Sequence, residues 1–165
     1  MKAKSFSGMR CSMAGALEVV GDRWALLLIR DLSLGLRRYD ELRASTGIPP
    51  ATLAARLTHL VEGGLVERVR YQERPPRDEY RLTDRGRDLW KVTVALREWG
   101  DRWDASGFGV PMEMVDRHTG RPLRLTLVDA ETGEAVPIER AMMRPGPDAD
   151  DAVHRLLGAG SEKGR

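Results

Sequence analysis

The side chains best equipped for chemistry in this chain are the arginines of one short segment. Residues 65–82, LVERVRYQERPPRDEYRL, carry five arginines around a Pro-Pro pair: Arg68, Arg70, Arg74, Arg77 and Arg81. A guanidinium is permanently charged, and its fork of donors binds phosphate oxygens or the edge of a guanine. Two prolines at a turn lower the entropy lost on ordering it, so Arg74 and Arg77 beside them can bind at little cost. Because Glu73, Asp78 and Glu79 partly neutralise the segment, a merely solvated hairpin is the alternative.

A second set of candidate side chains lies just upstream, on a predicted helix over 50–62. Its apolar residues repeat at helical spacing and define an inner face: Leu53, Leu57, Leu60 and Val61. With Arg56 on its border, the opposite face carries small or hydrogen-bonding residues: Ala51, Thr52, Ala55 and His59. Such a face fits the major groove of DNA, where Thr52, Arg56 and His59 would reach base edges or nearby phosphates. A solvated helix face is the alternative.

The sole cysteine, Cys11, is the third candidate. It precedes a predicted helix whose dipole stabilises a thiolate, and Arg10 is adjacent. Without a second cysteine in the chain, its chemistry would be adduct formation or a Cys11–Cys11′ bridge between two copies. A cysteine that only packs is the alternative.

Other chemistries are not indicated. The three histidines, His59, His118 and His154, lack metal-ligand spacing. No Gly-rich phosphate loop, Ser/His/Asp arrangement or recognisable pair of carboxylates is present. We therefore expect no catalysis, no metal and no cofactor.

These residues need elements to position them. Helices are predicted over 12–20, 22–32 (with Asp22 as its cap) and 39–46, followed by a turn at Gly47 and the helix over 50–62. Pro50 suits a first turn, and Gly63-Gly64 ends the helix. Strands over 65–71 and 79–82 complete a helix-turn-helix with a hairpin. The fold class is therefore mainly α with a small β-hairpin wing (α+β), a winged helix-turn-helix, in which Arg37 and Arg38 would contact phosphates.

A long helix capped by Thr83 is predicted to follow. Its apolar residues are spaced 3, 4, 3, 4, which is a heptad seam for packing against another helix: Leu89, Val92, Leu96, Trp99 and Trp103. Trp90 and Val94 would face the chain's own core. The tryptophans and methionines near this helix would also suit a cavity for a small aromatic effector, with plain core packing as the alternative.

Composition agrees with one core and a small appendage in 165 residues. Residues 1–104 carry 19 Lys and Arg against 15 Asp and Glu, whereas 105–165 carry 8 against 10. The positive excess thus lies with the expected DNA-binding part. We expect a cytoplasmic protein with no membrane contact, because there is no long apolar run or secretory leader and cysteine is scarce.

Several motifs, read in order, resemble the HxlR-type winged-helix transcriptional regulators. The matching segments are Cys11, LEVVGDRWALLLIRDL (17–32), RRYDEL (37–42), GLVERVRYQERPPRDEYRLTDRGR (64–87) and ALREWGDRW (95–103). The resemblance implies a dimeric DNA-binding regulator whose first and last helices form the dimer, and a cysteine at the place of Cys11 that senses oxidants or electrophiles in several relatives. Pro49-Pro50 departs from the pattern, because many relatives have a capping serine there.

The C-terminal extension, 105–165, predicts a small β-hairpin over RLTLVDAETGEAVPI, a short helix over 150–157 and a frayed tail over 158–165. It resembles a zinc-ribbon-like piece found in longer relatives. The knuckle cysteines of that piece are replaced in this chain by Thr119, Asp129 and Thr132. Without thiolates the tetrahedral zinc site is missing, so we expect a hairpin without metal.

The sequence therefore predicts two parts, 1–104 for DNA binding and dimerisation and 105–165 as the extension. We expect a homodimeric repressor that binds double-stranded DNA at an inverted-repeat operator, switched by thiol modification or by a small-molecule or oxidant effector. The alternative is a protein-interaction module that uses the winged helix as a scaffold.

Overall fold

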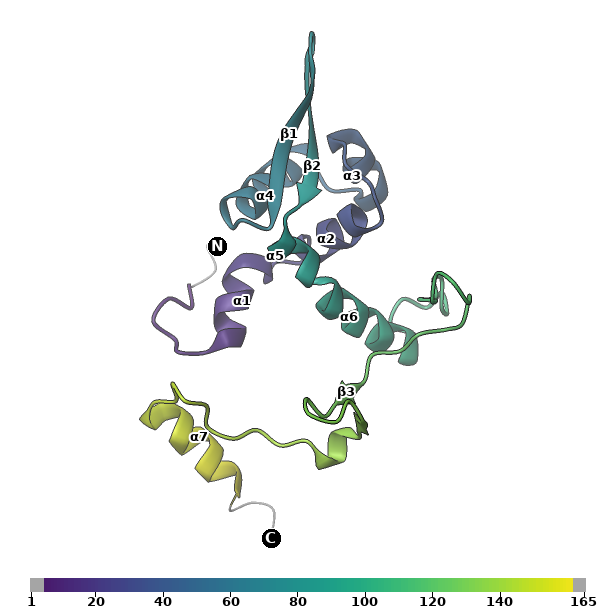
Figure 1. Ribbon diagram of the computed structural model, residues 1–165. Helices are drawn as coiled ribbons and strands as arrows, with labels where there is room; N and C mark the ends of the chain where they lie inside the picture. Colours follow the sequence, from purple (N-terminus) through teal and green to yellow (C-terminus); the bar gives the residue numbers. More distant parts are fainter. Residues whose placement is uncertain (1–4, 162–165) are drawn as a thin grey trace. The chain divides into compact units, whose positions relative to one another are not determined.

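The computed structural model describes residues 5–161 of the chain. The chain forms two compact units, residues 1–115 and 116–165, and each is described by itself. The first unit holds α1–α6 and a β-hairpin, and the second holds a short hairpin, a 3-10 turn and α7 (Figure 1). The predicted α+β class is confirmed.

Two helices begin the first unit. α1 spans Ser12–Val20 and α2 spans Ala25–Ser33. The Oδ1 atom of Asp22 accepts hydrogen bonds from the N–H groups of Trp24 at 2.8 Å and Ala25 at 3.2 Å, so Asp22 satisfies the start of α2, which lies at Ala25 and not at residue 22 as predicted. The buried residues of α2 are the centre of the core: Ala25, Leu28, Ile29 and Leu32.

The helix-turn-helix has the predicted bounds. α3 spans Tyr39–Thr46 and α4 spans Pro50–Glu62. Gly47 between them has φ 66°, a left-handed conformation that suits glycine, and Ile48 then inserts into the core. The hydroxyl of Tyr39 donates to the carbonyl of Pro50 at 2.8 Å, which ties the two helices together.

The hairpin is longer than the sequence indicates. β1 spans Val66–Glu73 and β2 spans Pro76–Leu82, paired antiparallel from Val66↔Leu82 to Glu73↔Pro76. Arg74 and Pro75 alone form the turn, so Pro76 belongs to a strand and not to the tip. Hydrogen bonding to the partner strand extends each strand beyond the residues whose own propensity favours β structure. The base of the hairpin is attached to the core by a hydrogen bond from the Tyr80 N–H to the Arg37 carbonyl at 2.8 Å.

The predicted single helix after Thr83 is wrong, because it is interrupted at Leu89. α5 spans Asp84–Asp88 and α6 spans Trp90–Arg102. Thr83 does cap α5, since its Oγ1 accepts from the Gly86 N–H at 3.1 Å. The Leu89 N–H then bonds to the Gly86 carbonyl, three residues back, which tightens the backbone and redirects the next helix.

Gly86 explains how α5 sits so close to the hairpin base. It is buried, and a Cβ added there would lie 2.0 Å from the carbonyl oxygen of Leu65. Leu89 packs partly against the core, whereas Trp90 lies outside the core cluster, so the expectation that Trp90 faces the core is wrong.

The second unit is built on two turns of the same sequence pattern, Asp-x-x-Thr-Gly. The predicted hairpin is present as β3, Leu127–Val128, paired with β4, Ala135–Val136, and a 3-10 turn follows at Ile138–Arg140. α7 spans Asp151–Ser161, so the predicted helix extends past residue 157. Of the predicted frayed tail, residues 162–165 lie outside the described part of the chain.

Candidate nucleic-acid interface

The outer face of α4 presents small side chains. Leu53, Leu57 and Leu60 point into the core, and the exposed positions opposite them are Ala51, Ala54, Ala55 and Thr58. Thr52, Arg56 and His59 are half-buried at the edges of this face. A helix with short side chains outward can approach base edges closely, because little bulk holds it away from the groove floor.

Two of the predicted reading residues contact the protein itself. Arg56 Nε lies 3.4 Å from Oδ1 of Asp22, an ion pair without a hydrogen bond, and Nε2 of His59 lies 3.3 Å from the carbonyl oxygen of Glu18. Both contacts lead from α4 to the end of α1 and the connection after it. The position of α1 is therefore coupled to the side chains along one edge of α4.

Asp78 organises the arginines on the strands of the hairpin. Its carboxylate accepts from Nε of Arg68 at 2.8 Å and from Nε of Arg70 at 2.6 Å. The hydrogen bond from Arg70, followed by that from Arg68, holds the pKa of Asp78 below its ordinary value. Arg81 pairs with Glu79 in the same way, with its Nε 2.6 Å from the carboxylate. Arg70 also lies 3.7 Å from a carboxylate oxygen of Glu73, so each strand arginine is paired within the hairpin.

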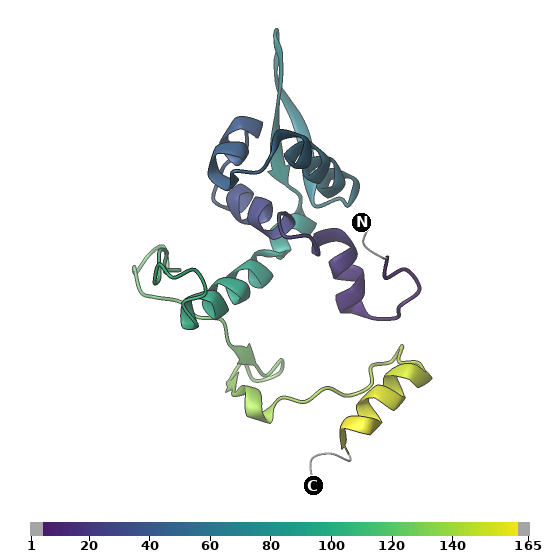
Figure 2. The same ribbon diagram turned by 180° about the vertical axis from the view of Figure 1, so that it is seen from behind.

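The tip of the hairpin differs. Arg74 and Arg77 are exposed, and neither makes an ion pair with any other described residue. In Figure 2 the hairpin extends past the helical core, on the side of α3 and α4. The uncompensated positive charge of the hairpin therefore lies at its end.

Arg37 and Arg38 are held at the start of α3. The Glu41 carboxylate accepts from the backbone N–H of Arg37 at 3.0 Å and from that of Arg38 at 2.9 Å, and these bonds lower the pKa of Glu41. Both arginine side chains are exposed. The guanidinium of Arg38 lies 6.0 Å from the ring centre of Tyr71 on β1, so this pair stands between α3 and the hairpin.

The heptad seam of α6 faces solvent in the single chain, apart from Leu89. Its large apolar side chains are about half exposed: Val92 46%, Leu96 53%, Trp99 59% and Trp103 65%. On α1, Met13 and Leu17 are exposed as well. A row of this size is rare on the surface of a protein that acts alone.

Cys11 is exposed and stands immediately before α1, at its N-cap. Among residues 5–161 no three His, Cys, Asp or Glu side chains group together as a metal site. No helix in the described part of the chain combines the length and apolar character needed to cross a membrane.

Sequence reasoning missed two features of this region. The contacts of Arg56 with Asp22 and of His59 with Glu18 join segments that are distant in the sequence, and no local sequence pattern predicts them. The selective neutralisation of the hairpin arginines by Asp78 and Glu79 did have a signal. Carboxylates placed opposite or beside arginines in an antiparallel pair are expected to form such bridges.

A helix-turn-helix whose second helix presents an outer face beside a basic hairpin defines a winged helix-turn-helix protein. The family model for the HxlR-like helix-turn-helix matches residues 19–107, and the chain belongs to this family. An HTH-type transcriptional regulator of Mycobacterium tuberculosis, Rv3095, is 40% identical over 136 residues, which are 82% of this chain and 86% of that protein. The chain is thus a helix-turn-helix transcriptional regulator.

Solved structures of similar proteins support the same family and fold. The crystal structure of PA1607, described as a transcription factor, superposes with a TM-score of 0.73 at 36% identity and covers 86% of this chain and 99% of its own. The redox regulator HypR in its oxidised form gives a TM-score of 0.53 at 32% identity and covers 56% of this chain and 96% of its own. The expected family and fold are confirmed.

Proposed function

We propose that this chain is a cytoplasmic, non-enzymatic repressor that binds an inverted-repeat operator as a homodimer. The observation that carries the proposal is the distribution of charge on the hairpin. Its strand arginines are paired with carboxylates of the hairpin itself, whereas Arg74 and Arg77, at the tip that extends past the helices (Figure 1), make no ion pair with a described residue. Duplex DNA offers phosphates to the tip and a groove to the helix.

Each set of residues has its own role in this proposal. Ala51, Thr52 and Ala55 lie against base edges in the major groove, and Arg56 and His59 reach bases or phosphates along one edge. Arg74 and Arg77 contact the backbone or minor groove. Arg37 and Arg38 bind phosphates and fix the orientation of the helix without reading sequence.

The apolar seam of α6 supports the homodimer. Association along Val92, Leu96, Trp99 and Trp103, together with Met13 and Leu17 of α1, removes exposed apolar surface from water. A two-fold dimer presents two α4 helices to one face of DNA. Its half-sites are then about 34–36 Å apart, or a multiple of that distance.

The test begins with selection of bound duplexes from a random pool, followed by affinity measurements at several salt concentrations. Arg77→Ala weakens binding to all duplexes and reduces the slope of log affinity against log salt by about one phosphate contact per subunit. Thr52→Ala instead changes which sequence is preferred. Lys91→Ala on α6 is the matched charge control. Unchanged affinity and slope for Arg77→Ala would remove the hairpin tip from the interface.

We also propose that Cys11 switches the repressor through a thiol adduct or a bridge between the Cys11 residues of the two subunits. Its exposure and its place at the start of a helix support the proposal, and HypR, named a redox regulator, has a similar fold. Treatment with a quinone or peroxide is expected to change the intact mass and the DNA affinity of the wild type but not of Cys11→Ser. Equal loss of binding by both would exclude Cys11 from the switch.

A further inference from the structure

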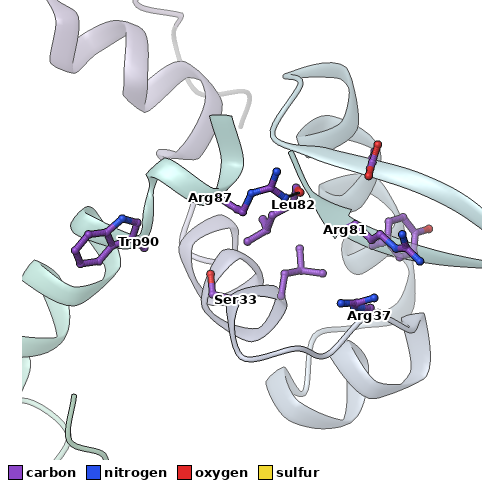
Figure 3. A pocket seen from close by; sticks show the side chains of 9 residues that line it. Ser33, Arg37, Arg81, Leu82, Arg87 and Trp90 are labelled. Atoms are coloured by element: carbon purple, nitrogen blue, oxygen red, sulfur yellow. Dashed lines mark hydrogen bonds between the residues drawn. The ribbon is translucent and has the colours of Figure 1, made fainter. Parts of the chain in front are cut away.

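A cleft of about 550 Å³ opens at the base of the hairpin, at the point where α2, the hairpin, α5 and α6 meet (Figure 3). Its lining comes from segments that lie far apart in the sequence. Leu32 and Ser33 end α2, Arg37 precedes α3, Glu67 is on β1, Tyr80 to Leu82 end β2, and Arg87 and Trp90 belong to α5 and α6. Its volume is within the range of clefts that hold small organic ligands.

The lining has the two chemical parts that an aromatic acid requires. Leu32 and Leu82 give an apolar floor, and the ring of Tyr80 adds flat apolar surface. Three arginines and one carboxylate, that of Glu67, also line the cleft, and Arg81 and Arg87 each pair with a carboxylate outside the lining. Burial raises the pKa of Tyr80, which leaves its phenol neutral and able to donate a hydrogen bond.

The three arginines of the cleft differ in how many hydrogen bonds and ion pairs they already make within the protein. Arg87 donates from Nη1 to the carbonyl of Leu82 at 2.6 Å and also pairs with Asp84, so its place is fixed by the hairpin base. Arg81 is paired on one side with Glu79. Arg37 makes no side-chain ion pair within the described part of the chain. In the view of Figure 3, Arg37 and Arg81 lie together at one end of the cleft and Trp90 lies at the other.

We propose that this cleft binds a small planar aromatic carboxylic acid, with the ring over Leu82 and Tyr80 and the carboxylate toward Arg37 and Arg81. A carboxylate accepts two parallel hydrogen bonds from a guanidinium, which favours an acid over a neutral aromatic. The consequence for DNA rests on the proposed function. Because Arg37 is proposed to bind phosphate, an acid that engages Arg37 competes with DNA and weakens binding.

The test uses 2-naphthoate as the probe and naphthalene-2-carboxamide as its neutral counterpart. Binding to the free protein is measured by calorimetry and by the backbone amide signals of Tyr80 and Leu82 in a ¹H–¹⁵N spectrum. These signals are expected to shift saturably with 2-naphthoate, while the indole signal of Trp103 stays in place. The carboxamide is expected to bind at least about tenfold more weakly, since a charged hydrogen bond is lost.

Arg81→Gln removes a carboxylate partner outside the proposed DNA contacts, and Lys91→Gln removes the same charge from a residue that does not line the cleft. Arg81→Gln is expected to bind 2-naphthoate about tenfold more weakly, and Lys91→Gln as tightly as the wild type. No saturable shift, equal binding of the carboxamide, or equal loss in both variants would overturn the assignment.

A second arm adds 2-naphthoate to the DNA complex. The affinity of the wild-type protein for duplex DNA is expected to fall when 2-naphthoate is added. The affinity of Arg81→Gln is expected to fall less at the same concentration. Binding of 2-naphthoate without any effect on DNA would overturn the coupling to Arg37. A protein that binds 2-naphthoate but no duplex would refute the proposed function and leave the cleft assignment standing, and the reverse result would refute the cleft alone.

Discussion

At the scale of single residues, charge in this chain is as notable for where it is neutralised as for where it is free. Asp78 occupies Arg68 and Arg70, Glu79 occupies Arg81, and the tip arginines remain available. Asp22 has two tasks, since the same Oδ1 satisfies the start of α2 and lies beside Arg56 of α4. One carboxylate therefore links helix stability to a candidate reading residue.

The two tasks of Asp22 can be separated by substitution. Asparagine also caps helices well, whereas alanine offers no acceptor. Asp22→Ala is expected to lower the free energy of unfolding by about 1 kcal/mol, while Asp22→Asn changes it by less than about 0.5 kcal/mol. Asp22→Asn also weakens the hold on Arg56, so DNA affinity is expected to rise a few-fold. Urea denaturation at fixed protein concentration and binding titrations measure these effects. Equal destabilisation by both variants would contradict the capping role.

At the scale of elements, local signals and tertiary contacts decided different boundaries. The bounds of α3 and α4 followed from local signals, because Gly47 favours the left-handed turn and Pro50 and Gly63 mark the ends of α4. The interruption at Leu89 and the length of the hairpin depend on tertiary packing and on strand pairing. Neither can be predicted from the sequence of one segment alone. The predicted capping role of Thr83 is confirmed for the same reason as the bounds of α4, because a helix cap is a local interaction.

Gly86 tests the packing of α5 on the hairpin base. Gly86→Ala is expected to destabilise the fold by about 1–3 kcal/mol, because the new Cβ collides with the Leu65 carbonyl and the backbone has to move. Gly100→Ala on α6 is the matched control, since nothing lies within 4 Å of a Cβ there. It is expected to stabilise by up to about 1 kcal/mol through the better helix propensity of alanine. Thermal unfolding of both variants decides the matter, and a harmless Gly86→Ala would contradict the close approach.

The two Asp-x-x-Thr-Gly turns of the C-terminal unit are each closed by an aspartate side chain. Oδ1 of Asp116 accepts from the N–H groups of His118 at 2.8 Å and Thr119 at 2.7 Å, and Oδ1 of Asp129 makes the same pair of bonds to Glu131 and Thr132. The resemblance of this unit to a zinc ribbon stays a prediction, and the two equivalent turns held by Asp116 and Asp129 were not predicted from the sequence.

These bonds give the turns a defined dependence on pH. The bonds from Thr119 and His118 lower the pKa of Asp116, so their contribution is complete above the ordinary carboxyl pKa and is lost as pH falls through the lowered value. The amide signal of Thr119 is expected to show an acid transition with a midpoint below about 3.9, the ordinary value for aspartate. The transition should be absent in Asp116→Ala. A midpoint at or above the ordinary value would contradict the turn geometry.

At the scale of the whole molecule, the proposed binding to an inverted repeat requires two copies of the chain. Leu96→Glu is expected to place a charge in the proposed dimer seam and to yield a folded monomer, with DNA affinity reduced by at least about tenfold because only one half-site is engaged. Leu34→Glu introduces the same change at another exposed leucine, at the end of α2, and should leave the dimer intact. Light scattering gives the molar mass. A wild type that is monomeric at micromolar concentration would remove the dimer from the account.

The central claim is that the outer face of α4 and the tip of the hairpin lie in the grooves of duplex DNA. Tethered cleavage tests it most directly, with an iron chelate attached to a single cysteine placed at Ala55 or Arg77 in the Cys11→Ser background. From both positions the account predicts two clusters of strand breaks, one in each half-site, with the Ala55 cuts inside the site and the Arg77 cuts at its flank. A chelate at Lys91 should give none. Uniform cleavage, or cuts from Lys91 as strong as those from Ala55, would contradict the claim.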